Sequence, residues 1–241
     1  MTPDSSDPLG PIGPFDARPG AGPRPRAVRP RDAATLIVLR RDGGKPRLLM
    51  GRRNKGHSFM PGMWVFPGGR IDRSDYRAPH VGELPGETRR RLGIGATPAK
   101  AHALALAAIR ETFEETGLMI GKPAPARPAA GPWREFLGHG AVADLSTLQM
   151  VARAVTPPQL PKRFDARFLM APAEALISLD RQPDCGELDE IAWVDMEEAL
   201  ALELPGVTRF VVKEIAQRLE NPERPALYMR FVGRRSRVTQ I

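Results

Sequence analysis

The sequence predicts an α/β protein, because runs typical of β-strands alternate along the chain with runs typical of α-helices. Residues 33–40 form an almost continuous apolar run, which is typical of a buried strand. Thr97 and Pro98 are residue types favoured at a helix start, and Gly117 is the type favoured just after a helix end. We therefore expect one long helix between Thr97 and Gly117.

The strand at residues 33–40 is expected to open a hairpin. Residues 41–44, Arg-Asp-Gly-Gly, predict a turn, and residues 47–51 predict the returning strand. Residues 60–69 then predict a short strand that ends in a pair of glycines. Because glycine has no side chain, the backbone at Gly69 can approach a ligand closely.

The segment at residues 72–96 is long and irregular, with a short helix expected at about 87–92. Long irregular loops are often functional, so substrate contact, a lid and a dimer contact all stay open for it. After the long helix, further elements follow from turn residues and apolar spacing. They are a loop at 122–132, short helices at 133–137 and 196–202, strands at 148–155, 163–170 and 191–194, and a helix at 207–219.

The length of 241 residues favours one domain with tails. We expect residues 1–31, rich in Pro and Gly, to be a disordered tail, residues 32–222 to be the domain, and residues 223–241 to be a basic segment. The sequence has no apolar run of about 18 residues and no secretory signal at its start. Cys185 is the single cysteine, so no intrachain disulfide forms and a cytoplasmic location is expected.

The formal net charge of +8 is compatible with anionic partners, either nucleic acid or small molecules. The basic residues do not alternate with aromatic ones in the manner of single-strand-binding proteins. We therefore expect a small anionic ligand rather than nucleic acid.

The densest group of carboxylates lies near the end of the long helix. Glu111, Glu114 and Glu115 share one helical face, since residues three and four apart are neighbours. The small side chains of Ala107 and Ala108 on that face are expected to leave room for a bulky ligand. The opposite face is apolar and carries His102, Leu106, Ile109 and Phe113.

Like charges on one helical turn repel each other, so these glutamates need a counter-charge. A hard divalent cation such as Mg²⁺ is a natural candidate, and Arg110 could orient one carboxylate. The alternative is an acidic face that is simply solvated, which is the common fate of charge runs.

The complete motif around these glutamates favours a metal site over a solvated acidic face. Residues 110–118, Arg-Glu-Thr-Phe-Glu-Glu-Thr-Gly-Leu, with Phe-Pro-Gly-Gly at 66–69, resemble the Nudix box, G-x5-E-x7-R-E-U-x-E-E-x-G-U with U apolar. Thr112 is a mild departure at one U position. The box is split, because Arg110 follows Gly69 by 41 positions instead of 14, an insertion of about 27 residues. The first Glu of the pattern could correspond to Asp75, counted from Gly69, or to His102, counted back from Arg110.

The resemblance implies a Nudix-type α/β/α sandwich with a mixed β-sheet, and hydrolysis of a nucleoside diphosphate linked to another moiety, with Mg²⁺ or Mn²⁺ as cofactor. By resemblance, the metal ligands are Glu111, Glu114, Glu115 and the main-chain oxygen of Gly69. Glu111 is either a third side-chain ligand or the general base, and Arg110 orients it. An additional acid is expected from the loop before residue 191, with Glu187 favoured, Glu190 second and Asp189 nearby. The residues expected to contact substrate are Arg53, Phe66 and Arg70.

The split box also resembles the branch that includes peroxisomal coenzyme A diphosphatases and their bacterial relatives, so coenzyme A or acyl-CoA is one expected substrate. Arg53, Gly62 and Phe66 align with a coenzyme A signature of other family members, but Ser58 stands where its second Arg belongs. ADP-ribose, NADH, nucleotide sugars and RNA 5′ ends remain alternatives. A Nudix-fold sensor that binds a nucleotide without cutting it is the alternative from another class. A homodimer is possible.

Overall fold

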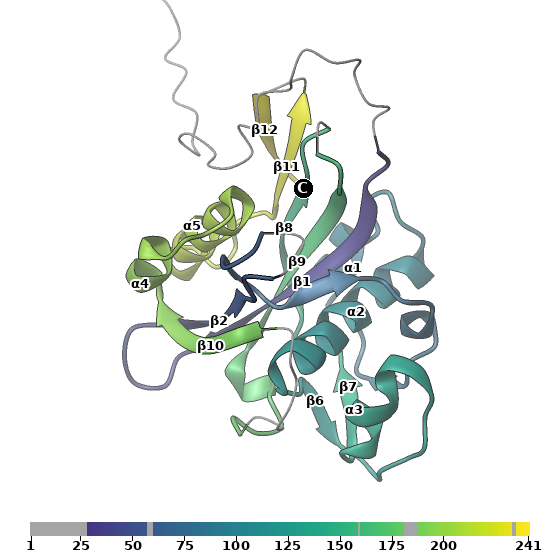
Figure 1. Ribbon diagram of the computed structural model, residues 1–241. Coiled ribbons are helices and arrows are strands. Elements are labelled where there is room, and N and C mark those ends of the chain that lie inside the picture. Colours follow the sequence, from purple (N-terminus) through teal and green to yellow (C-terminus); the bar gives the residue numbers. More distant parts are fainter. Residues whose placement is uncertain (1–27, 57–59, 159, 181–187, 233–234) are drawn as a thin grey trace, which may run out of the picture.

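The computed structural model describes residues 28–56, 60–158, 160–180, 188–232 and 235–241 (Figure 1). A mixed sheet lies at its centre, with strand order β10-β2-β1-β9-β8-β11-β12, and with β3 paired to β2 and β4 to β1. The strands are β1 (Arg31–Arg40), β2 (Arg47–Arg53), β3 (Trp64–Val65), β4 (Gly68–Arg70), β8 (Gln149–Val155), β9 (Phe164–Pro172), β10 (Leu188–Asp195), β11 (Leu227–Val232) and β12 (Arg235–Gln240). Strands β1 and β9 run parallel, whereas β1 and β2 form the expected antiparallel hairpin.

Helices cover both faces of this sheet (Figure 1). One layer contains α1 (Gly86–Leu92), α2 (Pro98–Thr116) and α3 (Arg134–Gly138), and the other contains α4 (Met196–Ala201) and α5 (Gly206–Glu220). Because successive strand residues point to opposite faces, Leu36 and Val38 of β1 pack in the core with α2, whereas Ile37 and Leu39 pack in the core with α5. This arrangement confirms the expected α/β/α sandwich with a mixed sheet.

Helix α2 begins and ends where the sequence predicts. The Thr97 side chain accepts a hydrogen bond from Lys100 N at 3.2 Å, and Gly117 ends the helix with a left-handed φ of 73°. The helix is buried on nearly every side, and Ala107 and Ala108 lie in the core with no exposed surface. The expectation that these alanines leave room over the glutamates is therefore wrong.

The segment between the two halves of the split box is ordered and packed. It contains η1 (Arg73–Tyr76), β5 (His80–Val81) and α1, and β5 joins β6 (Gly121–Pro123) and β7 (Ala141–Asp144) in a small sheet of order β5-β7-β6. The Thr88 hydroxyl donates to Leu148 O at 2.9 Å and accepts from Met150 N at 3.2 Å. Arg153 Nη1 donates to Ile94 O at 2.8 Å. These contacts attach the segment to strand β8.

Short 3-10 helices complete the layer of α2, at η2 (Gly131–Trp133) before α3 and at η3 (Ala173–Ala175) after β9. Among the described residues, no helix combines the length and the apolar character that a membrane crossing requires.

The last part of the chain extends the central sheet. Strands β11 and β12 form an antiparallel hairpin, and β11 pairs in parallel with β8 through Leu227–Met229. The sequence analysis assigned only a basic segment to residues 223–241, so these two strands are an addition from the structure.

A charged network ties β1 to β9 and α2. Asp32 accepts from Arg167 Nη1 at 2.7 Å and from Lys100 Nζ at 2.9 Å. Partial burial disfavours the Asp32 carboxylate, but the hydrogen bond from Lys100 and the charge of Arg167 outweigh it, so the pKa of Asp32 lies below its ordinary value.

Candidate active site

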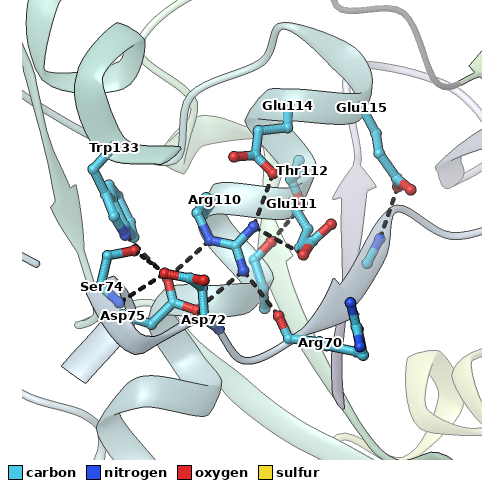
Figure 2. Close-up of polar contacts among 12 residues, drawn as sticks. Arg70, Asp72, Ser74, Asp75, Arg110, Glu111, Thr112, Glu114, Glu115 and Trp133 are labelled. Atoms are coloured by element: carbon cyan, nitrogen blue, oxygen red, sulfur yellow. Dashed lines mark hydrogen bonds and ion pairs between the residues drawn. The ribbon is translucent and has the colours of Figure 1, made fainter. Parts of the chain in front are cut away.

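The end of α2 brings the three glutamates of the split box beside strand β4 (Figure 2). The guanidinium of Arg110 lies among them, and this residue is only 3% exposed. Its Nη1 donates to Glu111 Oε1 at 2.8 Å and to Glu114 Oε2 at 2.8 Å. One cation therefore orients two of the three carboxylates, as expected for Arg110 and Glu111.

The other side of the guanidinium is held by Asp75. Arg110 Nε donates to Asp75 Oδ1 at 2.8 Å, and Nη2 donates to Asp75 Oδ2 at 3.0 Å and to Arg70 O at 2.9 Å. Asp75 is fully buried, and each of its oxygens accepts one more hydrogen bond, from Trp133 Nε1 at 3.0 Å and from Asp72 N at 2.7 Å. Such bidentate pairing fixes the plane of the guanidinium.

The contact decides between the two candidates for the first acid of the pattern. Asp75 contacts Arg110, whereas His102 Nδ1 lies 3.0 Å from Pro98 O and its ring centroid lies 5.9 Å from that of His80. His102 is partly exposed instead of forming part of the apolar face. The contact with Arg110 therefore favours Asp75 over His102 as the candidate for the first acid.

The charge of Arg110 is strongly favoured by this environment. Burial disfavours the cation, but the hydrogen bond with Asp75 and the negative charges of Glu111, Asp75 and Glu114 outweigh it, so the pKa of Arg110 is raised above its ordinary value. A permanent cation thus faces three carboxylates, and the cluster keeps an excess of negative charge.

The paired glycines allow β4 to lie against the acids. Gly68 N donates to Glu115 Oε2 at 2.8 Å, and a Cβ atom on Gly68 would lie 2.6 Å from Ala34 O of β1. A Cβ atom on Gly69 would overlap the carboxylate of Glu111. Larger residues at either position would push the strand away from β1 or from the glutamates.

A cavity of about 660 Å³ opens beside these residues, a size typical of small-molecule sites. Its lining includes Glu111, Glu115 and Gly69, but not Glu114. The three residues expected to contact substrate, Arg53, Phe66 and Arg70, also line it. The structure thus places these three side chains in one cavity with two of the three glutamates.

The acids expected before residue 191 are not brought to the cavity in the described part of the chain. Glu190 Oε2 lies 3.0 Å from Arg52 Nη2 in a largely exposed ion pair, and Asp189 Oδ1 accepts from Asn54 Nδ2 at 2.8 Å. Neither residue lines the cavity. Glu187, Cys185 and Ser58 lie outside the described residues.

The sequence analysis did not find the far half of the cavity. Phe164, Ala166 and Phe168 of β9 line it, and so do Met229 and Phe231 of β11. The signal was available in both strands, since these residues alternate with polar ones and residues two apart share a face of a sheet.

The residues present suit a hard divalent cation by their chemistry. Carboxylate and carbonyl oxygens are the ligands that Mg²⁺ and Mn²⁺ prefer, and Glu111, Glu115 and Gly69 all line the cavity. Within the described ranges, no three His, Cys, Asp or Glu side chains already converge on one cation position. Glu111 and Glu114 instead contact Arg110, and Glu115 contacts the Gly68 N–H.

Comparisons with known proteins agree with this geometry, although no family model matches the chain. A Caenorhabditis elegans relative whose name includes nudix hydrolase 7 is 26% identical over an alignment of 186 residues, and the match covers 70% of this chain and 53% of that protein. The acyl-coenzyme A diphosphatase NUDT19 of Gallus gallus is 25% identical over 241 residues, with 73% of this chain and 64% of that protein covered. The chain thus spans less than two thirds of the length of both curated relatives.

A solved structure gives a wider match. The crystal structure of a NUDIX hydrolase from Alicyclobacillus acidocaldarius has a TM-score of 0.61 and 28% sequence identity, and the match covers 79% of this chain and 93% of that one. The expected resemblance to Nudix hydrolases is confirmed by these comparisons.

Proposed function

We propose that this chain, which resembles the Nudix hydrolases in fold and in sequence, is a Mg²⁺- or Mn²⁺-dependent hydrolase of nucleoside diphosphates linked to another moiety. The observation that carries the proposal is the carboxylate of Glu111, which lines the cavity together with Glu115 and is oriented by the buried guanidinium of Arg110. A solvated acidic face would not need a buried guanidinium held by a fully buried aspartate.

The residues that would hold the cation are Glu111, Glu115 and Gly69, with Glu114 as the neighbouring carboxylate. A bound cation would neutralise the oxygens of a diphosphate and lower the pKa of a bound water. Arg110 keeps Glu111 and Glu114 directed while Asp75 keeps Arg110 in place. Because Glu190 lies outside the cavity, we propose that a helix carboxylate, rather than Glu190, accepts the proton of the attacking water.

We further propose coenzyme A or acyl-CoA as the substrate. Support comes from the name of the Gallus gallus relative, an acyl-coenzyme A diphosphatase, and from the split box. Arg53 and Arg70 line the same cavity as Glu111 and Glu115, and we propose that they contact the phosphate oxygens.

The test is a panel of coenzyme A, acyl-CoA, ADP-ribose, NADH and nucleotide sugars with Mg²⁺ or Mn²⁺, followed by identification of the phosphate ester products. Turnover of coenzyme A or acyl-CoA is expected, together with its loss in Glu115→Gln while ligand binding is kept. Glu220→Gln, at an exposed position at the end of α5, is the matched control and should remain active. A protein that binds ADP-ribose but cuts nothing in the panel would be a sensor, and the proposal would be wrong.

A further inference from the structure

We propose that the far half of the cavity is a trough for a narrow apolar arm of the substrate, and that strand β11 forms its end wall. This inference rests on the proposed function, because it concerns the part of the substrate beyond the diphosphate. It assigns specificity to residues of β8, β9 and β11 that contact neither Arg110 nor the glutamates in the described hydrogen-bond network.

The floor of the trough is one row of residues across five strands. The pairing registers join Arg70 of β4 to Ala33 of β1, Ala33 to Ala166 of β9, Ala166 to Ala154 of β8, and Ala154 to Met229 of β11. Directly paired residues share one face of a sheet, and all five line the cavity. The row therefore lies on the α5 face of the sheet, starts at β4, the strand whose Gly68 N donates to Glu115, and ends at β11.

Three residues of this row are alanines, whose small side chains leave open space above the sheet. We call Ala33, Ala166 and Ala154 the alanine row. Larger side chains at these positions would fill the space over the sheet, as Phe164 and Phe168 do on either side of Ala166 along β9. Four strand spacings of about 4.8 Å give the floor a length of roughly 19 Å. The shape suits an extended chain rather than a compact ring.

Aromatic side chains form part of the walls of the trough, and Arg31 and Lys162 also line the cavity. Phe164 and Phe168 flank the alanine row from β9, and Phe231 lies two residues after Met229 on the same face of β11. The nearby guanidinium of Arg163 donates to the main-chain oxygens of Thr156 at 3.1 Å and Val28 at 2.8 Å. These hydrogen bonds of Arg163 go to the backbone, and the aromatic side chains beside it provide the apolar contact surface.

The end wall is held firmly in place. The turn before β11 is fastened to α5 by Arg218, whose guanidinium donates to the main-chain oxygens of Arg224 at 2.6 Å and Pro225 at 2.9 Å. Arg218 also pairs with the buried carboxylate of Glu214 at 2.7 Å. Met229 and Phe231 therefore limit the arm at a fixed distance from the glutamates.

The experiment measures binding without turnover. Isothermal titration calorimetry in EDTA gives the affinities of ADP and of acetyl-, hexanoyl- and decanoyl-CoA for the full chain. A fully buried methylene raises affinity about fourfold, so partial burial along the trough should raise the affinity from acetyl- to hexanoyl-CoA, and the end wall should give decanoyl-CoA no further gain. Ala166→Leu, which raises the floor, should remove most of this gain, whereas Phe231→Ala, which opens the end wall, should let decanoyl-CoA bind more tightly than hexanoyl-CoA.

The matched control is Val232→Ala, because Val232 is the next residue on β11 but is 60% exposed and does not line the cavity. It should keep the full gain, and ADP should bind all variants equally. An affinity that does not depend on chain length in the unmodified protein would overturn the trough. A parallel loss of ADP affinity in Ala166→Leu and Phe231→Ala would also overturn it, since the nucleoside would then occupy this half. If the protein hydrolyses no compound of the panel, the proposed function is wrong, but the dependence of binding affinity on chain length is unaffected.

Discussion

Replacing Asp75 with asparagine tests whether the buried ion pair holds the site together. The two carboxylate oxygens accept four N–H groups, two from Arg110 and one each from Trp133 and Asp72. Asparagine keeps one acceptor oxygen but presents an NH₂ group to the other two donors. Leaving two buried donors unpaired, at roughly 1–3 kcal/mol each, gives an expected loss of about 3 kcal/mol in the free energy of unfolding. The melting temperature should fall by about 6–12 °C for a chain of this length.

Urea denaturation followed by tryptophan fluorescence would measure this loss, with a thermal melt as a second readout. Asp72→Asn is the matched control, three residues away and exposed. It accepts from Ser74 N at 2.8 Å as a cap, a role that asparagine fills almost equally well, so a change of only a few tenths of a kcal/mol is expected. Equal and small losses in the two variants would refute the reasoning, because Asp75 would then contribute no more than a surface cap.

Three other perturbations probe the glycine strand, the cation and the acid response. Gly69→Ala should lower turnover about 10²-fold through displacement of Glu111, whereas Gly44→Ala, which meets open space, should leave steady-state rates unchanged; equal rates would contradict the close packing. Mg²⁺ at about 100 times its Kd should raise the free energy of unfolding by about 2.7 kcal/mol over the EDTA-treated protein, a shift that Glu115→Gln should abolish in thermal melts. Because the folded-state pKa of Asp32 lies below its ordinary value near 3.8, its ion pairs stabilise the fold above that value and are lost as pH falls through the folded pKa. Asp32→Asn should therefore cost on the order of 1–2 kcal/mol at pH 7 and progressively less as the pH falls below 3.8 in urea titrations; a constant difference would argue against the pairing.

Features that depend on neighbours along the chain could be predicted from the sequence. Thr97 and Gly117 define both ends of α2 because capping uses backbone groups of the same helix. The burial of Ala107 could not be predicted, because the layer that covers α2 is assembled from distant segments. The choice between Asp75 and His102 likewise needed a contact to Arg110 that crosses 35 positions, and counting residues cannot supply it.

The C-terminal strands are a second feature that could not be predicted from local sequence. The alternation in residues 227–232 is visible in the sequence, but a strand on its own has no reason to form. Its partners are β12, which follows it in a hairpin, and β8, which lies more than 70 positions earlier and pairs through Ala152 and Ala154. The basic side chains of this segment predict only a charged surface, whereas apolar residues between them pack against the core.

The attachment of α1 to β8 explains how a binding motif tolerates being interrupted. Lengthening the connection from 14 to 41 positions costs only about 1 kcal/mol in loop-closure entropy, since that cost grows with the logarithm of length. The hydrogen bonds that join Thr88 and Ile94 to the sheet offset this entropic cost. The spacing in a sequence motif thus reflects the shortest connection between two fixed structural elements. A longer connection can replace it when the added residues pack against the fold.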